Sequence, residues 1–366
     1  MKVFNLKNCC IISTPPFFHF YSNDKHCEKD TRNTRKAGAR TLQSLPGVLY
    51  TPVKRTTMEN STEMLFVLQG LNDTKSSKKT YFVVTLLVYI FTTLVNLTLI
   101  SIIGLDRKLH EPMFIFLCNM CVNGIFGVST FYPKILVDLS SDVSVTPYKA
   151  CLAQMLVIYS YIFCEFTTLA VMAFDRYVAI CKPLKYHSII TPRKVANFLC
   201  FTWLFSISES AIGMGLIARL PLCGFNIDKI YCTSWAVVKL SCVDTTINNI
   251  YGYILTIIHS LEAGVIFVSY VNIVKASARS PEERSKFMQT CLPHLISLGN
   301  FTVAIVFDVM YARYGSNTSL HTLRSFMSVE YLVVPPLLNP LIYGLKLNQI
   351  RRRIFRVCNR KTSTLK

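Results

Sequence analysis

The sequence predicts an all-α membrane protein, a bundle of seven transmembrane helices. The first observation is composition: of 366 residues, 51% are hydrophobic and only 16% are charged, with a mean hydropathy of +0.38. Ordinary soluble domains are less apolar than this. The second is the recurrence of nearly charge-free windows of about 20 residues, the length that crosses a hydrocarbon core about 30 Å thick. The third is an uneven distribution of Lys and Arg between alternate loops.

Seven windows have the length of a membrane span. Buried helices of a soluble protein are the weaker alternative, because soluble cores seldom repeat charge-free windows of this length. In chain order the windows are Tyr81–Gly104, Met113–Leu136, Cys151–Phe174, Val195–Ala218, Ile247–Val274, Thr290–Ala312 and Ser325–Leu345.

The Lys and Arg residues predict the orientation of these spans. Nineteen of them fall in the loops after spans one, three and five and in the C-terminal segment, whereas seven fall at the opposite ends. Short loops rich in basic residues stay in the cytoplasm. We therefore expect the N-terminus outside, the C-terminus inside, and a short cytoplasmic helix after span seven in the basic tail, 346–366. The net charge of +19 then reflects topology and attraction to the lipid bilayer, so nucleic-acid binding is not expected.

Residues 1–57 do not fit this plan. They contain ten Lys and Arg against three acids, and Pro15-Pro16 interrupts the one apolar patch, which does not resemble a signal peptide. We expect a disordered leader that can be absent from the natural product. An extracellular tail over 58–80 and the seven-helix domain over 81–345 follow it. Sequons at Asn60 and Asn72 lie in the tail and are expected to be glycosylated.

The third span ends in an abrupt change of chemistry, "MAFDRYVAICKPLKYH", where a charge-free run meets Asp175-Arg176-Tyr177. Further motifs follow in a fixed order: "LHEPMF" after span one, "SYVNIV" at the end of span five, "KFMQTCLPHL" at the start of span six and "PLLNPLIYGLK" at the end of span seven. Together they resemble the odorant receptors, a family of rhodopsin-like G-protein-coupled receptors. The resemblance covers Met58 to about Arg360. It implies a receptor of the cell membrane that binds a small organic ligand, activates a heterotrimeric G protein of the stimulatory olfactory type and raises cAMP.

The resemblance also implies a switch for G-protein coupling. In the resting state of the family the arginine is held by its neighbouring acid, and activation frees it while two tyrosines swing inward. By chemistry alone, a carboxylate beside a guanidinium at a helix end can satisfy itself, and a proline kinks a helix by removing a hydrogen bond. A charge pair that merely anchors the helix at the interface is the alternative. The residues are Asp175, Arg176, Tyr177, Tyr270, Asn339, Pro340 and Tyr343.

Four cysteines lie on the expected outer side, where conditions are oxidising: Cys151, Cys223, Cys232 and Cys242. They allow three pairings, and the residues themselves do not choose among them. The resemblance favours Cys151–Cys232 and Cys223–Cys242. Cys358, beside the basic tail, could be palmitoylated.

Carboxylates inside the spans are costly and point to function. Many rhodopsin-like receptors share a sodium ion between a span-two aspartate and span three, but Gly124 stands at that place with Asn123 beside it. A sodium site that rests on Glu165 alone is doubtful, and Glu165 could instead be protonated. We therefore predict no metal site and no cofactor. Asp308 and Glu330 could line a ligand entrance or simply face water.

The resemblance places the ligand pocket between the outer halves of spans three, five, six and seven. The matching positions are mostly aliphatic or aromatic, as a pocket for small, partly apolar ligands requires. Helix packing alone would produce the same stripe. The positions are Ile158, Tyr159, Ile162, Phe163, Ile254, Ile258, Ile305, Val306 and Leu332.

Other classes of protein fit less well. A secondary transporter would show inverted repeats or paired broken helices, and an enzyme would show a motif such as HExxH, GxSxG or a P-loop, none of which occurs in the sequence. No enzymatic activity is expected. The alternative function is a rhodopsin-like receptor for a non-odorant metabolite expressed outside olfactory tissue, which tissue of expression would distinguish.

Overall fold

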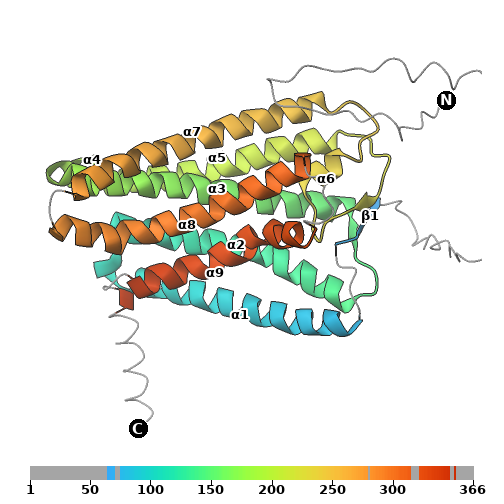
Figure 1. Ribbon diagram of the computed structural model, residues 1–366, viewed down its shortest axis with the longest axis horizontal. Coiled ribbons are helices and arrows are strands. Elements are labelled where there is room, and N and C mark those ends of the chain that lie inside the picture. The colour runs from blue at the N-terminus through green and yellow to red at the C-terminus, as the bar shows by residue number, and fades with distance from the viewer. Residues whose placement is uncertain (1–63, 71–74, 279–280, 315–320, 347–349, 352–366) are drawn as a thin grey trace, which may run out of the picture. The chain divides into compact units, whose positions relative to one another are not determined.

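The computed structural model describes residues 64–70, 75–278, 281–314, 321–346 and 350–351, and its long helices pack side by side as a bundle (Figure 1). Within this part of the chain, six helices have the length and apolar composition to cross a membrane, and α9 is a further long helix. The long helices are α1 (Lys75–Leu105), α2 (Pro112–Ser140), α3 (Tyr148–Cys181), α5 (Pro192–Ala218), α7 (Thr246–Ser277), α8 (Pro281–Tyr314) and α9 (His321–Lys346).

Local sequence explains where several helices begin. Pro112 and Pro192 occupy the first position of α2 and α5, where the missing N–H costs nothing. At α5 the preceding Thr191 accepts a hydrogen bond from the backbone N–H of Lys194 at 3.4 Å. Both α2 and α5 therefore begin just after loops that we expect in the cytoplasm.

Helix α3 lies at the centre of the bundle. In its apolar window 72% of the residues are buried, against 17% in α7 and 22% in α1. It packs against α2, α5, α7 and α8, while α9 packs against α1, α2 and α8. Side chains from α3 can therefore reach most of the other helices. This one helix contributes residues to both the candidate switch and the candidate pocket.

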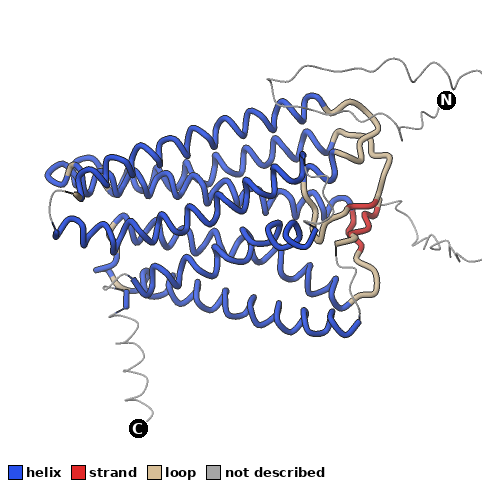
Figure 2. The backbone as a smooth tube through the Cα atoms, viewed as in Figure 1, coloured by secondary structure: helices blue, strands red, loops and turns tan. Residues whose placement is uncertain are grey.

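A small sheet closes one end of the bundle (Figure 2). Its strands are β1 (Leu65–Leu68), β2 (Val145–Pro147) and β3 (Asn226–Ile227), in the order β2-β1-β3, with β1 antiparallel to β2 and parallel to β3. We call these strands, together with residues 219–245 and the short helix α6 (Ser234–Val238), the cap. Phe66 of β1 is fully buried in a second apolar cluster with Met155 and Val237. The all-α prediction missed this sheet, since its strands are too short to show a pattern.

At the other end of the bundle, the described residues form short elements between the long helices. They are α4 (Tyr186–Ile189) and two 3-10 turns, Arg107–Leu109 and Pro183–Lys185. Of the predicted cytoplasmic helix, only Ile350 and Arg351 are described, and both are helical. The predictions for the leader 1–57, for the sequons at Asn60 and Asn72 and for Cys358 lie outside the described residues.

Candidate functional site

The end of α3 opposite the cap contains a closed set of polar contacts, which we call the lock: Asp175, Arg176 and Tyr186. Arg176 donates to Asp175 Oδ2 from Nε at 3.0 Å and from Nη2 at 2.5 Å. The hydroxyl of Tyr186, from α4, donates to Asp175 Oδ1 at 2.7 Å. Asp175 is 1% exposed, so both carboxylate oxygens are satisfied away from water. The guanidinium of Arg176 therefore points to Asp175 and not out of the bundle.

The two predicted switch tyrosines are both buried near this end. Tyr270 of α7 shares a hydrogen bond with Nδ1 of His294 on α8, and its ring stacks on the imidazole at 5.5 Å between centroids. Tyr343 of α9 is 1% exposed, and its hydroxyl has no hydrogen-bond partner among the described residues. A buried hydroxyl without a hydrogen-bond partner costs free energy. A movement that gives the Tyr343 hydroxyl a partner would therefore be favourable.

A polar network in the middle of the bundle joins four helices around Glu165. Its Oε2 accepts from Asn123 of α2 at 2.9 Å, and its Oε1 accepts from Asn339 of α9 at 2.8 Å. Ser297 of α8 donates to the amide oxygen of Asn339 at 2.6 Å. Both oxygens of Glu165 are therefore used by amide donors. In the described part of the chain, no group of three His, Cys, Asp or Glu residues could hold a metal ion.

Helix α9 contains three prolines, and for two of them a neighbouring helix supplies the hydrogen bond that the proline removes. Pro340 cannot donate to the carbonyl of Pro336, and Asn96 of α1 donates to that oxygen at 2.7 Å instead. Pro335 cannot donate to the carbonyl of Tyr331, which accepts from the hydroxyl of Tyr161 on α3 at 2.9 Å. The proline-containing stretch of α9 thus accepts hydrogen bonds from side chains of α1 and α3.

Space for Tyr161 comes from a glycine on α2. A Cβ added to Gly127 would meet the ring of Tyr161 at 2.7 Å, closer than such contacts are tolerated. The ring therefore lies directly against the α2 backbone, and its hydroxyl reaches α9 from there. Gly127 is required here for close approach of two helices.

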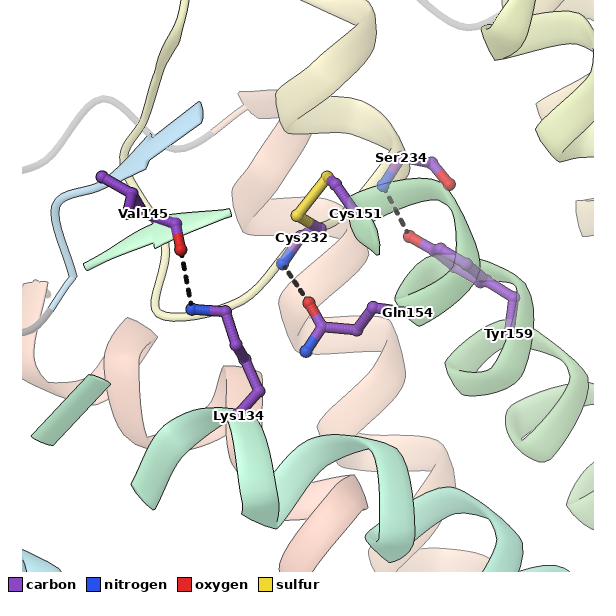
Figure 3. The surroundings of a disulfide bond; sticks show 7 residues. All are labelled: Lys134, Val145, Cys151, Gln154, Tyr159, Cys232 and Ser234. Atoms are coloured by element: carbon purple, nitrogen blue, oxygen red, sulfur yellow. Dashed lines mark hydrogen bonds between the residues drawn. A yellow bond between two sulfur atoms is a disulfide. The ribbon is translucent and has the colours of Figure 1, made fainter. Parts of the chain in front are cut away.

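Two disulfides and several hydrogen bonds fix the cap, and Figure 3 shows the surroundings of the bond between Cys151 and Cys232. The structure joins Cys151 to Cys232 and Cys223 to Cys242, the pairing that the resemblance favours. Beside the first bond, Gln154 of α3 accepts from the backbone N–H of Cys232 at 3.1 Å. The cap is therefore bound to the start of α3 both covalently and through its backbone.

Two cap side chains also reach the ends of α8 and α9. Lys229 pairs with Asp308 of α8 at 2.7 Å, and both side chains are largely buried, at 7% and 14% exposed. Tyr231 donates to the carbonyl of Ser328 at 2.7 Å and shares a hydrogen bond with the hydroxyl of Tyr331. The cap thus ties α3, α8 and α9 together above the predicted pocket.

Most predicted pocket residues lie inside the bundle below the cap. Ile158, Ile162, Phe163 and Leu332 are buried, while Tyr159, Ile258 and Ile305 are partly buried. The hydroxyl of Tyr159 accepts from the backbone N–H of Ser234 in the cap at 3.1 Å (Figure 3).

Two predicted pocket residues lie on the outer surface of the bundle instead of in its interior. Ile254 of α7 is 47% exposed and Val306 of α8 is 54% exposed. Each continues an outward-facing apolar stripe at helical spacing, with Ile250 and Ile257 on α7 and with Val303 and Met310 on α8. Their sequence positions matched the pocket, but the rotation of each helix points them to the bilayer.

A polar cluster between α3, α5 and α7 abuts the pocket region. Nδ1 of His259 lies 2.9 Å from Glu262, which also accepts from Thr167 at 2.9 Å, and Nε2 faces Glu209 at 3.8 Å. The imidazole stacks on the ring of Phe163 at 4.7 Å between centroids. The predicted pocket residue Phe163 therefore has an ionisable group on its face, which limits the purely apolar character expected there.

The comparisons with known proteins agree with this geometry. The family model described as olfactory receptor matches residues 85–361. Human olfactory receptor 8I2 is 35% identical over 309 residues, which cover 82% of this chain and 98% of that protein. Mouse olfactory receptor 2C1 is 33% identical and covers 81% and 96%. The chain belongs to the olfactory receptor family. The predicted family is confirmed, and it is a family of signalling receptors and not of enzymes.

The fold of this olfactory receptor is also found among solved structures. The crystal structure of squid rhodopsin superposes with a TM-score of 0.63 at 16% identity and covers 78% of this chain and 81% of that one. The predicted seven-helix bundle is thereby confirmed, and the chain is a multi-pass membrane protein.

Sequence reasoning about this olfactory receptor missed the partners of its functional residues. It did not connect Asn96 with the carbonyl of Pro336 or Lys229 with Asp308. It did not connect Tyr186 with Asp175, although both lie in the quoted motif. The missing proline N–H groups of α9 were the one signal that could have pointed to donors such as Asn96 and Tyr161.

Proposed function

We propose that this olfactory receptor binds a small organic odorant below the cap and activates a heterotrimeric G protein of the stimulatory olfactory type, which raises cAMP. The proposal places the receptor in the cell membrane with the cap outside and the lock in the cytoplasm, as the distribution of Lys and Arg predicts. The observation that carries it is the lock: a buried Asp175 that holds Arg176 at the end of the central helix.

A continuous set of contacts supports coupling between the two ends. Tyr231 of the cap forms hydrogen bonds with Ser328 and Tyr331 of α9. The carbonyl of Tyr331 accepts in turn from the hydroxyl of Tyr161 on α3. Further along the same two helices, Asn339 of α9 binds Glu165 of α3. A ligand that shifts α9 against α3 would disturb these bonds, and the lock lies ten residues beyond Glu165 on the same helix. Spatial continuity makes coupling possible, and mutation must demonstrate it.

Replacement of Arg176 by Ala tests the proposal. The full chain would be expressed with an olfactory Gα subunit and a cAMP reporter, and screened with a panel of volatile and water-soluble organic compounds. Arg176→Ala should abolish the cAMP response at matched surface expression, because it removes the group that is freed towards the G protein. Arg193→Ala, at an exposed position on α5, is the matched control and should respond like the wild type. A normal response from the Arg176 variant would refute the role of the lock.

A further inference from the structure

A groove lies between α8 and α9 on the outer surface of the bundle. Its volume is about 540 Å³, within the usual range of small-molecule sites. Val303 is 63% exposed and Gly299 is also exposed, whereas Phe301 and Ala304 on the same helix are fully buried. The groove therefore faces the bilayer and is separate from the region below the cap. Its lining residues are Gly299, Asn300, Val303, Met327, Glu330 and Val334.

One lining residue, Glu330, is a buried carboxylate with an unused oxygen. It is 6% exposed, and its Oε1 accepts from the side-chain amide of Asn300 at 2.6 Å. Its Oε2 is buried, and no donor among the described residues reaches it. Among those same residues, no cationic side chain forms an ion pair with Glu330. A carboxylate at membrane depth is costly unless it is paired, so the groove lacks one cationic hydrogen-bond donor.

We propose that this groove is a binding site for a small membrane-soluble amine. The ammonium group donates to Oε2 of Glu330, and the apolar body lies along Val303, Met327 and Val334. Glu330 lies five residues into the expected span Ser325–Leu345, about 7.5 Å along the helix axis at 1.5 Å per residue, which places it inside the hydrocarbon region. The amine of a phospholipid headgroup stays at the membrane surface, outside that region. The occupant is therefore a compact amphiphile that enters from the hydrocarbon region.

A glycine makes the groove easy to block without disturbing the fold. A Cβ added to Gly299 would meet nothing within 4 Å. Gly299→Leu should therefore fill the groove with an isobutyl group while the backbone stays in place, and a helix gains stability when glycine is replaced. Gly264 of α7 also has open space beside it and is exposed away from the groove. Gly264→Leu is the matched control.

The experiment uses the full chain in lipid nanodiscs and a dodecylamine that carries a diazirine cross-linker, with dodecanol carrying the same group as the neutral comparison. Cross-linked peptides are mapped by mass spectrometry. We expect labelling by the amine at 296–303 and 327–334, competed by unlabelled dodecylamine, and labelling by the alcohol at least about tenfold weaker, since a charge-assisted bond is lost. Glu330→Gln should weaken amine labelling by about tenfold or more, and Gly299→Leu should abolish it. Gly264→Leu should behave as the wild type.

Three results would overturn the proposal: labelling centred elsewhere on the chain, equal labelling by the amine and the alcohol, or labelling that Gly299→Leu leaves unchanged. If Glu330→Gln does not accumulate, the comparison between the two glycine variants and between the two probes decides the question. The readout needs neither an odorant nor a G protein, so a failure here is distinct from a failure of the proposed receptor function.

Discussion

The hydrogen bond from Tyr186 to Asp175 gives the most direct test of the lock. Tyr186→Phe removes one hydroxyl and leaves the ring in place, and the two bonds between Arg176 and Asp175 remain. Burial raises the pKa of Tyr186 above its ordinary value, and the Asp175 carboxylate raises it further, so the hydroxyl stays protonated and donates at neutral pH. The substitution therefore removes a donor from the resting state alone, if the lock opens on activation as proposed.

The structure sets the size of the expected effect. The bond is 2.7 Å long and its acceptor is a carboxylate that is 1% exposed, so it belongs with hydrogen bonds to charged groups, worth about 1.5–3 kcal/mol. Loss of about 1.5 kcal/mol multiplies the ratio of active to resting receptor by about ten. A receptor that is about 1% active at rest would become about 10% active. Basal cAMP should therefore rise several-fold without any ligand.

The assay measures basal cAMP at matched surface expression in cells that supply the G protein. Tyr81→Phe, at a position on α1 that is 48% exposed, is the matched control and should leave basal cAMP unchanged. Asp175→Asn removes the ion pair as well and should raise it further. If Asp175→Asn raises basal cAMP but Tyr186→Phe stays within about twofold of the wild type, Tyr186 is not part of the lock. If neither variant raises it, the lock itself does not restrain the receptor.

The remaining predictions concern stability and the start of the chain. Tyr161→Phe leaves the buried carbonyl of Tyr331 without a donor and should lower the unfolding free energy of the purified receptor by about 1–3 kcal/mol, visible as a lower melting temperature in detergent. Cys232→Ser opens a bond between residues 81 positions apart, worth about 4.5 kcal/mol in the chain-entropy account. It should remove the receptor from the cell surface in flow cytometry, and normal surface amounts would contradict this. A chain that begins at Met58 should reach the surface and respond like the full chain; loss of surface delivery would show that the leader is a targeting segment.

The sequence by itself determined the membrane class, the approximate spans and the family. These properties are local: a span needs about 20 apolar residues, and a motif such as that at Asp175-Arg176 is written in consecutive letters. It also supplied most of the residues that lie below the cap, because the family's motifs fix the register of each span. The cysteine pairing came from the resemblance, since four cysteines alone leave three choices.

Only the tertiary structure decided which residues meet. A span that is apolar on every side has no strong periodic pattern, so its rotation about its own axis cannot be read from the sequence. For this reason the sequence did not show that Ile254 and Val306 lie on the outer surface of the bundle. Packing sets that rotation through small residues and buried polar contacts between helices. Contacts such as those of Tyr161 with α9 and Lys229 with α8 join residues 170 and 79 positions apart, and they exist only once the bundle has formed.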